Sequence, residues 1–189
     1  ELADSGRNWR LGLTLCEDLW VDEELHEQRL LGGDPVADLQ ALRPDLLLNL
    51  SASPFGQGKA QLRRDLAAAA ARRLQCPVVY VNQVGGNDEL VFDGGSFVTG
   101  TDGTVLHQMS FAEADLGLWD ARDAAPPEGL LAALPATDDL LLRALVLGVR
   151  DYARKCGFSK ALLGLSGGID SALVAVIAAA ALGAENTQA

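Results

Sequence analysis

Short apolar runs alternate along this chain with longer segments in which apolar residues recur at helical spacing. Three runs, at residues 9–15, 45–50 and 77–82, have the length of strands and are mostly apolar. Continuous apolar runs of this kind are typical of buried strands in parallel sheets. Helices are predicted between them, at residues 35–42 and 58–74. The alternation predicts an α/β fold in which helical crossovers cover a sheet.

The segment after the third apolar run is rich in glycine. Residues 83–95 include four glycines and are predicted to form a loop. Residues 96–100 and 105–108 then have strand character, with Asp102 and Gly103 between them. Because Asp-Gly between two apolar runs is a strong turn signal, a β-hairpin is predicted here.

The composition changes after residue 121. Residues 122–137 contain three prolines and few large apolar side chains, which is typical of a linker. Residues 138–156 then have apolar side chains at helical spacing. The chain is therefore predicted to have two parts, residues 1–121 and 138–189, joined by the linker at 122–137.

The most informative stretch is Ser166-Gly167-Gly168-Ile169-Asp170-Ser171, which joins an apolar run at residues 160–165 to an apolar helix. A strand, a tight turn and a helix N-terminus aim backbone N–H groups and the positive end of the helix dipole at one point. The glycines let the backbone approach an anion, and the two serines add hydroxyl donors. The pattern predicts a phosphate-binding site; a glycine-rich turn without a ligand is the alternative.

Asp170 is unusual beside bound phosphates, because a carboxylate and a phosphate repel each other. A cation between them removes the repulsion, so Asp170 is a candidate Mg²⁺ ligand. The stretch lacks the Gly-x-x-x-x-Gly-Lys-Ser/Thr pattern of the Walker P-loop. It resembles instead the loop of the ATP pyrophosphatase family, which cleaves ATP between the α- and β-phosphates. The resemblance implies that Ser166, Gly167, Gly168, Asp170 and Ser171 bind pyrophosphate while AMP is transferred to a substrate oxygen.

Charge and cysteine usage narrow the class of protein. The net charge is −11, from 26 acidic and 15 basic residues, which argues against a nucleic-acid or anionic-membrane partner. No apolar run has the length of a membrane span. Cys16, Cys76 and Cys156 are odd in number and widely spaced, so they do not form a disulfide framework. A reducing, cytoplasmic location is expected.

Cys16 follows the first predicted strand directly and precedes two acidic residues, Glu17 and Asp18. A cysteine at the C-terminal end of a strand, next to a turn, is a candidate nucleophile. Its acidic neighbours do not favour a thiolate, so a cation would have to come from elsewhere. The alternative is that Cys16 is a small core residue.

Three stretches, residues 13–20, 49–55 and 80–97, resemble the C-terminal half of nitrilase-type amidases, which have the carbon–nitrogen hydrolase fold. Together with the Ser-Gly-Gly-x-Asp-Ser loop, they resemble the family of glutamine-dependent NAD⁺ synthetases. The resemblance implies the C-terminal half of a nitrilase-like α-β-β-α sandwich. After it, the resemblance implies a linker and then the start of a doubly wound parallel sheet like that of the adenine nucleotide α-hydrolases. This start consists of a helix, a strand and a helix. The likeness weakens at residues 185–189, which lack the pattern of the expected strand.

The amidases have a Glu-Lys-Cys triad, and Cys16 matches its nucleophile, which attacks the side-chain amide of glutamine and forms a thioester. The resemblance places the Glu and the Lys before residue 1. It also matches Glu17, Trp20, Ser53 and Lys59 to glutamine-binding positions. Glu17 and Ser53 are implied at the α-amino end of the substrate. Lys59 is implied at its carboxylate, and Trp20 at the pocket wall.

The function implied by the resemblance is glutamine-dependent NAD⁺ synthesis. Glutamine hydrolysis supplies ammonia, ATP with Mg²⁺ adenylates deamido-NAD⁺, and ammonia displaces AMP to give NAD⁺. The implied partners are thus glutamine, ATP and deamido-NAD⁺, and the intact protein is expected to be a homo-oligomer. Synthetases that pair this loop with other glutaminases have a Gly-x-Cys-x-Gly elbow or an N-terminal Cys, unlike Cys16-Glu17-Asp18.

The residues alone leave simpler interpretations open. Glu17 and Asp18 fit caps of a turn, Trp20 fits a core aromatic, and Ser53 fits ordinary turn chemistry. The chain is expected to be an internal fragment of a longer protein and inactive by itself. One alternative is therefore an inactive fragment or an assembly or binding module, and another is a nitrilase-type amidase fused to a different ATP-pyrophosphatase ligase.

Overall fold

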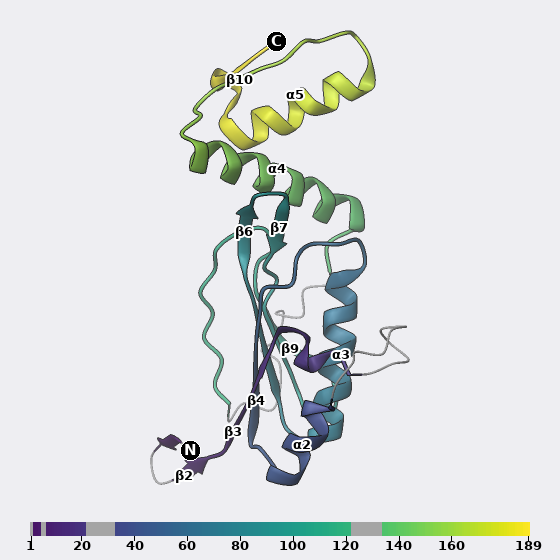
Figure 1. Ribbon diagram of the computed structural model, residues 1–189, viewed down its shortest axis with the longest axis vertical. Helices are drawn as coiled ribbons and strands as arrows, with labels where there is room; N and C mark the ends of the chain where they lie inside the picture. Colours follow the sequence, from purple (N-terminus) through teal and green to yellow (C-terminus); the bar gives the residue numbers. More distant parts are fainter. Residues whose placement is uncertain (1, 5–6, 22–32, 122–133) are drawn as a thin grey trace.

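The computed structural model describes residues 2–4, 7–21, 33–121 and 134–189, and the chain runs from one end of an elongated molecule to the other (Figure 1). A five-stranded sheet forms the larger part, in the order β3-β4-β5-β8-β9. Its strands are β3 (Leu11–Leu15), β4 (Leu46–Ser51), β5 (Val78–Asn82), β8 (Phe97–Thr99) and β9 (Val105–Gln108). A separate hairpin of β1 (Leu2–Asp4) and β2 (Arg7–Trp9) precedes the sheet.

The three predicted apolar strands are confirmed, and they are parallel neighbours. Leu13 pairs with Leu48, and Leu48 pairs with Val79. Their carboxyl ends therefore lie at one edge of the sheet, where Cys16 and Asn82 are found. The predicted hairpin is also confirmed, because β8 and β9 pair antiparallel around the turn at residues 100–104.

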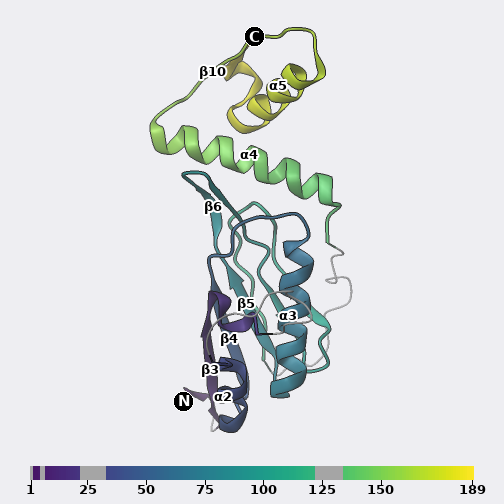
Figure 2. The same cartoon turned by 45° about the vertical axis from the view of Figure 1, so that its right-hand side comes forward.

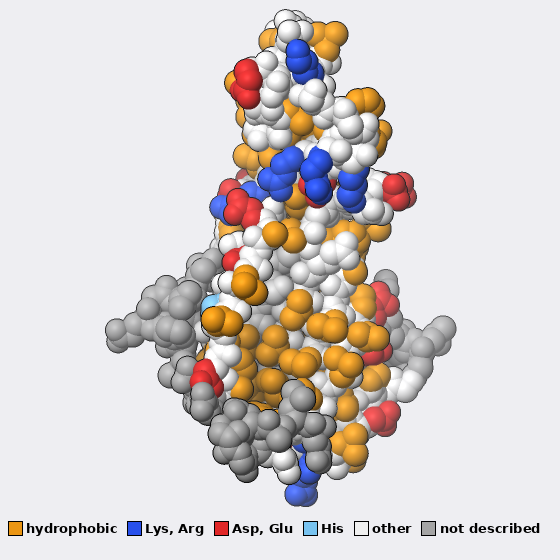
Figure 3. All heavy atoms as spheres, turned by 90° about the vertical axis from the view of Figure 1, so that its left-hand side faces the viewer, with side chains coloured by type: hydrophobic (Ala, Val, Ile, Leu, Met, Phe, Trp, Pro, Cys, Tyr) orange, Lys and Arg blue, Asp and Glu red, His pale blue; other side chains and the backbone are white. Residues whose placement is uncertain are grey.

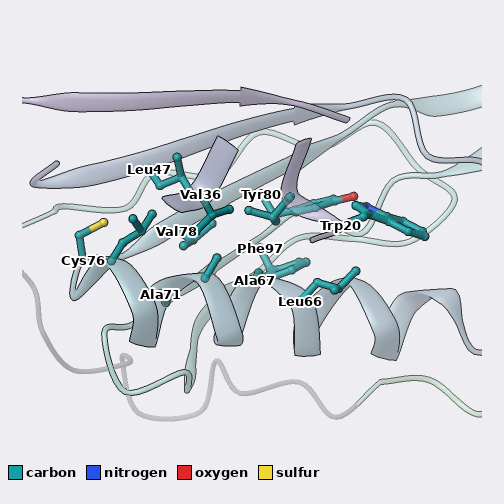
Figure 4. Close-up of a cluster of buried hydrophobic side chains, with 13 residues drawn as sticks. Trp20, Val36, Leu47, Leu66, Ala67, Ala71, Cys76, Val78, Tyr80 and Phe97 are labelled. Atoms are coloured by element: carbon teal, nitrogen blue, oxygen red, sulfur yellow. The ribbon is translucent and has the colours of Figure 1, made fainter. Parts of the chain in front are cut away.

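Helices α2 (Pro35–Leu42) and α3 (Lys59–Leu74) cover one face of the sheet (Figure 2). The backbone N–H of Ala37 donates to the Asp34 side chain at 2.8 Å, so Asp34 caps α2. Small residues on the buried side of α3 let the helix pack closely on β5, and larger residues fill the remaining space (Figure 4). The buried cluster consists of Leu19, Trp20, Val36, Leu47, Leu66, Ala67, Ala70, Ala71, Leu74, Cys76, Val78, Tyr80 and Phe97.

The opposite face of the sheet is apolar but exposed. Leu13, Leu15, Leu50 and Val81 have exposed fractions between 42% and 58%. Figure 3 shows hydrophobic side chains gathered over this part of the molecule. Because alternate residues of a strand point to opposite faces, the continuous apolar runs supply both the core and this second apolar surface.

The prediction of a loop at residues 83–95 is wrong for most of its length. This segment contains a hairpin of β6 (Val84–Asn87) and β7 (Leu90–Asp93). Gly86 allows close packing there, because an added Cβ atom would lie 3.3 Å from the Cβ of Asp151 and 3.4 Å from the Cα of Gly148. Gly148 belongs to the helix that crosses the tip of this hairpin, so the glycine signal reflects a long-range contact.

That helix is α4 (Thr137–Cys156), close to the predicted residues 138–156, and it contacts β6 and β7 (Figure 1). The chain continues through β10 (Ala161–Leu162), α5 (Ile169–Leu182), η2 (Ala184–Asn186) and β11 (Thr187–Gln188). Most of the predicted linker, residues 122–133, lies outside the described residues.

Two expectations for the C-terminal part need correction. The strand predicted at residues 160–165 is only two residues long, β10. Residues 187–188 do form a strand, and β11 pairs parallel with β10 through Ala161 and Thr187. A pairing this short carries too few alternating residues to be recognised from sequence.

Candidate functional site

Cys16 lies at the turn between β3 and the short helix η1 (Cys16–Leu19), with φ of 48°. A residue other than glycine rarely adopts this conformation, which costs roughly 1–3 kcal/mol and often marks a functional site. The Asn49 side-chain amide donates to Thr14 Oγ1 at 3.0 Å and to the Cys16 carbonyl at 3.4 Å. Thr14 and Asn49 are both buried, so β3 and β4 together fix the backbone of the candidate nucleophile.

The two acidic residues after Cys16 have different surroundings. Asp18 caps the turn, because the backbone N–H of Leu15 donates to its carboxylate at 2.8 Å. Glu17 is exposed, and its backbone carbonyl accepts a hydrogen bond from the N–H of Trp20 at 2.8 Å. The simpler interpretation therefore holds for Asp18, whereas the Glu17 carboxylate faces solvent and is accessible to a ligand.

Trp20 and Lys59, two of the residues predicted to bind glutamine, lie next to each other. Trp20 is 6% exposed and belongs to the buried cluster, so it is a core aromatic as well as a candidate pocket wall. The Lys59 ammonium lies 5.4 Å from the centre of its ring, which is a cation–π geometry. Lys59 begins α3, so the helix start presents a positive charge near the end of η1.

Ser53 is buried in the segment after β4, where polar groups surround it. Its backbone N–H donates to Asn82 Oδ1 at 2.9 Å, and its hydroxyl accepts from Arg63 Nε at 3.2 Å. Arg63 also forms a two-point ion pair with Asp93, at 2.8 and 3.0 Å. Ser53 is therefore part of a buried polar network that extends from β4 to α3 and β7.

Three residues of this network, Arg63, Asn82 and Asp93, were not recognised from the sequence, and neither was Asn49, which bonds to the carbonyl of Cys16. Arg63 carried a signal, because it lies on the buried face of α3, which is otherwise apolar. A charged side chain on the buried face of a helix needs a partner in the fold. The partner could not be identified, since Asp93 is thirty residues further along the chain.

Tyr80 is a fully buried aromatic residue of β5 with a polar partner. Its hydroxyl donates to Ser51 Oγ at 3.1 Å, and its ring stacks on Phe97 with the ring centres 5.1 Å apart. Burial raises the pKa of the Tyr80 hydroxyl, whereas the hydrogen bond with Ser51, the Arg63 guanidinium and the Trp20 side chain lower it by less. The net direction is upward, so Tyr80 is a neutral hydrogen-bonding group at neutral pH.

The candidate phosphate loop joins β10 to α5, on the far side of α4 from the five-stranded sheet (Figure 1). Gly167 has φ of 84°, a conformation that glycine adopts without strain. The loop brings the hydroxyls of Ser166 and Ser171 to 3.2 Å from each other. Ser166, Gly167, Gly168 and Asp170 are exposed.

Asp170 lies in the first turn of α5, next to the two serines. The described residues contain no group of three His, Cys, Asp or Glu side chains able to hold a metal by themselves. One carboxylate beside phosphate oxygens nevertheless fits Mg²⁺, which usually takes one or two carboxylates plus substrate phosphates and water. In the described part of the chain, no helix has both the length and the apolar character needed to cross a bilayer.

Comparison with known families decides how this arrangement is classified. Residues 2–120 match the model of the carbon-nitrogen hydrolase family. The chain belongs to the carbon-nitrogen hydrolase family. Residues 141–189 match a second family model, NAD synthase, so a carbon-nitrogen hydrolase region is followed by part of a NAD synthase region in one chain. The predicted α/β fold class is confirmed by these two matches.

Relatives of this carbon-nitrogen hydrolase chain share both regions. A glutamine-dependent NAD(+) synthetase of Synechocystis is 49% identical over 95% of this chain and 33% of its own length. One from Rhodobacter capsulatus is 44% identical over 93% of this chain and 31% of its own length. The chain thus spans about a third of the length of the curated relatives it matches.

Solved structures agree with this relationship. The structure of a glutamine-dependent NAD⁺ synthetase from Acinetobacter baumannii, in complex with adenosine diphosphate, has a TM-score of 0.81 and 38% identity. It covers 94% of this chain and 32% of its own. A synthetase of the same name from Cytophaga hutchinsonii has a TM-score of 0.65 at 23% identity, over 95% of this chain and 26% of its own, and shows the same fold.

Proposed function

We propose that this chain is part of a glutamine-dependent NAD⁺ synthetase of the length of its relatives (the full-length enzyme). The observation that carries the proposal is the pairing of two sites in one chain. A strained cysteine follows a strand of a carbon-nitrogen hydrolase sheet, and a Ser-Gly-Gly-x-Asp-Ser loop follows in a NAD synthase region. Relatives with that name match both regions together.

In the hydrolase part, Cys16 attacks the side-chain amide carbon of glutamine, and the C–N bond breaks so that ammonia leaves as the thioester forms. Water then cleaves the thioester to glutamate and restores the thiol. The turn at Cys16, held by Asn49, fixes the sulfur relative to the substrate. This fixed position supplies orientation, whereas proton transfer and oxyanion stabilisation also need groups such as the Glu and Lys of the family triad.

Glutamine recognition uses side chains of both charges around this turn. The Glu17 carboxylate suits the α-ammonium group of glutamine, and the Lys59 ammonium suits its α-carboxylate. Trp20 supports Lys59 through its ring and forms a wall of the pocket. Ser53 adds a hydroxyl at the α-amino end. The opposite charges distinguish a free amino acid from a simple amide, which carries neither group.

In the synthase part, Ser166, Gly167, Gly168 and Ser171 hold the pyrophosphate of ATP through backbone N–H groups and hydroxyls. Asp170 binds the Mg²⁺ that accompanies ATP, which neutralises phosphate charge. The adenosine diphosphate in complex with the Acinetobacter baumannii enzyme supports an adenine nucleotide as ligand. Adenylated deamido-NAD⁺ then reacts with ammonia and gives NAD⁺ and AMP.

The domain limits follow from the same proposal. The hydrolase part is residues 1–121, the linker 122–137 and the synthase part 138–189. The family models, which end at residue 120 and begin at residue 141, support these limits. A homo-oligomer and a cytoplasmic location belong to the proposal as well.

The test is an assay of the full-length enzyme with deamido-NAD⁺, MgATP and glutamine. The proposal expects NAD⁺ and AMP to form in equal amounts, together with glutamate. Hydrolysis of unrelated amides without any consumption of ATP would contradict it. Substitution of ammonium chloride for glutamine separates the two halves, because ammonia bypasses Cys16.

A further inference from the structure

Arg63 is the most completely buried charged residue in the described part of the chain, with 2% of its surface exposed. Its guanidinium donates to groups of three different residues. Nη1 and Nη2 donate to the Asp93 carboxylate, and Nε donates to Ser53 Oγ. Nη2 also donates to the backbone carbonyls of Ser53 and Pro54, at 3.3 and 3.2 Å. One side chain thus holds both the hydroxyl and the backbone of the segment after β4.

Asp93 determines what Arg63 can do. The carboxylate of Asp93 neutralises the guanidinium of Arg63 at hydrogen-bond distance. Arg63 is therefore not expected to bind the carboxylate of a ligand as well. Lys59, one helical turn earlier on α3, is the cation with an accessible position near Trp20. Lys59 and Arg63 therefore have different roles, since Lys59 is accessible to a ligand and Arg63 is bound within the protein.

The hydrogen bond to Ser53 Oγ has a chemical direction. A guanidinium only donates, so Arg63 occupies one lone pair of the hydroxyl oxygen. The hydroxyl proton and the other lone pair stay available for a ligand, and donation from a charged group makes the O–H a better donor. Asn82 fixes the backbone on the other side of Ser53, by accepting from its N–H and donating to its carbonyl.

We propose that Arg63 is a positioning residue, which sets the hydroxyl of Ser53 for glutamine and is itself held by Asp93. The inference rests on the proposed glutaminase function. An apolar pair would fill the same volume with at least equal stability, so stability alone gives no reason for this ion pair. The planar guanidinium matches a carboxylate and a hydroxyl simultaneously, which an ammonium does not.

The test is Arg63→Lys in the full-length enzyme, with Arg73→Lys as the matched control. Arg73 lies on the same helix and pairs with Asp34 near the protein surface, at 2.6 Å. For Arg63→Lys we expect the KM for glutamine to rise about tenfold or more, which corresponds to one lost hydrogen bond to a charged group. For this variant, synthesis from ammonia should stay within about twofold of the wild type. Arg73→Lys should leave both the KM for glutamine and the rate of synthesis from ammonia unchanged.

A double-mutant cycle with Ser53→Ala shows whether Arg63 acts through Ser53. In the Ser53→Ala background, Arg63→Lys should raise the KM by less than about threefold, because the hydroxyl that it orients is gone. Asp93→Asn is the second variant. It keeps the shape of the ion pair without its charge, and the KM for glutamine should rise again while synthesis from ammonia persists.

The outcomes separate this inference from the proposed function. A wild-type enzyme without glutamine-dependent turnover contradicts the proposed function. An active wild type in which Arg63→Lys and Asp93→Asn leave the KM unchanged overturns only the role of Arg63. Equal loss of glutamine-dependent and ammonia-dependent synthesis in both variants also overturns it, because Arg63 is then needed for folding alone.

Discussion

The carboxylate of Asp151 accepts a hydrogen bond from the backbone N–H of Gly86 at 2.9 Å. Lys155, one turn further along α4, donates to the carbonyl of the same glycine and to Asn87 Oδ1. Asp151 is 7% exposed, and Arg154 lies 3.5 Å from its carboxylate. These contacts attach the first helix of the synthase part to the β6–β7 hairpin of the hydrolase part.

Loss of the hydrogen bond between Asp151 and Gly86 should weaken the packing of α4 on the β6–β7 hairpin. We expect Asp151→Ala to destabilise the contact by about 1.5–3 kcal/mol, because it leaves the N–H of Gly86 buried without a charged acceptor. Hydrogen exchange measured over residues 84–93 and 137–156 should become faster. Asp139→Ala, which breaks an exposed ion pair with Arg143 on the same helix, is the control and should change little. Identical exchange in the two variants would show that Asp151 does not hold the junction.

Cys76 predicts a loss of stability at alkaline pH. Burial raises the pKa of its thiol from 9.0 to about 11. Since the folded protein binds this proton more tightly than the unfolded chain, the stability that it contributes is complete below pH 9. That contribution is lost as the pH rises from 9 to 11.

Urea unfolding at pH 8 and pH 11, with thiols kept reduced, measures this effect. The wild type should lose about 2–3 kcal/mol more of its free energy of unfolding than Cys76→Ala over this interval. The exposed Cys156 provides the control, because Cys156→Ala should follow the wild type. A Cys76→Ala variant with the pH dependence of the wild type would contradict the assignment.

Asp170 predicts a dependence on magnesium. In the full-length enzyme, Asp170→Asn keeps the size of the side chain but removes the charge that binds the cation. We expect a higher Mg²⁺ concentration for half-maximal synthesis from ammonia and a lower maximal rate, both by about tenfold. Asp138→Asn, in the exposed first turn of α4, is the control. An unchanged magnesium titration for Asp170→Asn would remove Asp170 from the site.

Much of the fold could be predicted because its signals are local. The runs that became β3, β4 and β5 are mostly apolar, and Asp102 closes the β8–β9 turn by accepting hydrogen bonds from Thr104. The signal for the start of α2 is local too, since Asp34 caps the helix and directly precedes Pro35. Cys16, at the end of its strand, was found in the same way.

Other features depend on residues far apart in the sequence. The β6–β7 hairpin carries glycines because α4 packs against it, about sixty residues away. The ion pair of Arg63 and Asp93, and the amide of Asn49 behind Cys16, likewise join separate strands and helices. Each of these residues is of an ordinary type in its own segment, so its role became visible only when the fold brought its partner near.

The proposed function assigns ammonia release to one site and amidation to the other, and Cys16→Ala in the full-length enzyme separates these two steps. Rates of NAD⁺ formation are compared with glutamine and with ammonium chloride as nitrogen source, and Cys156→Ala is the control. We expect glutamine-dependent synthesis to fall at least about 10³-fold, because no other group forms the thioester. Synthesis from ammonia should stay within about twofold of the wild type. Survival of glutamine-dependent synthesis in Cys16→Ala would contradict the role of Cys16 as the nucleophile. Loss of synthesis from both glutamine and ammonia in a folded variant would contradict the separation of the two sites.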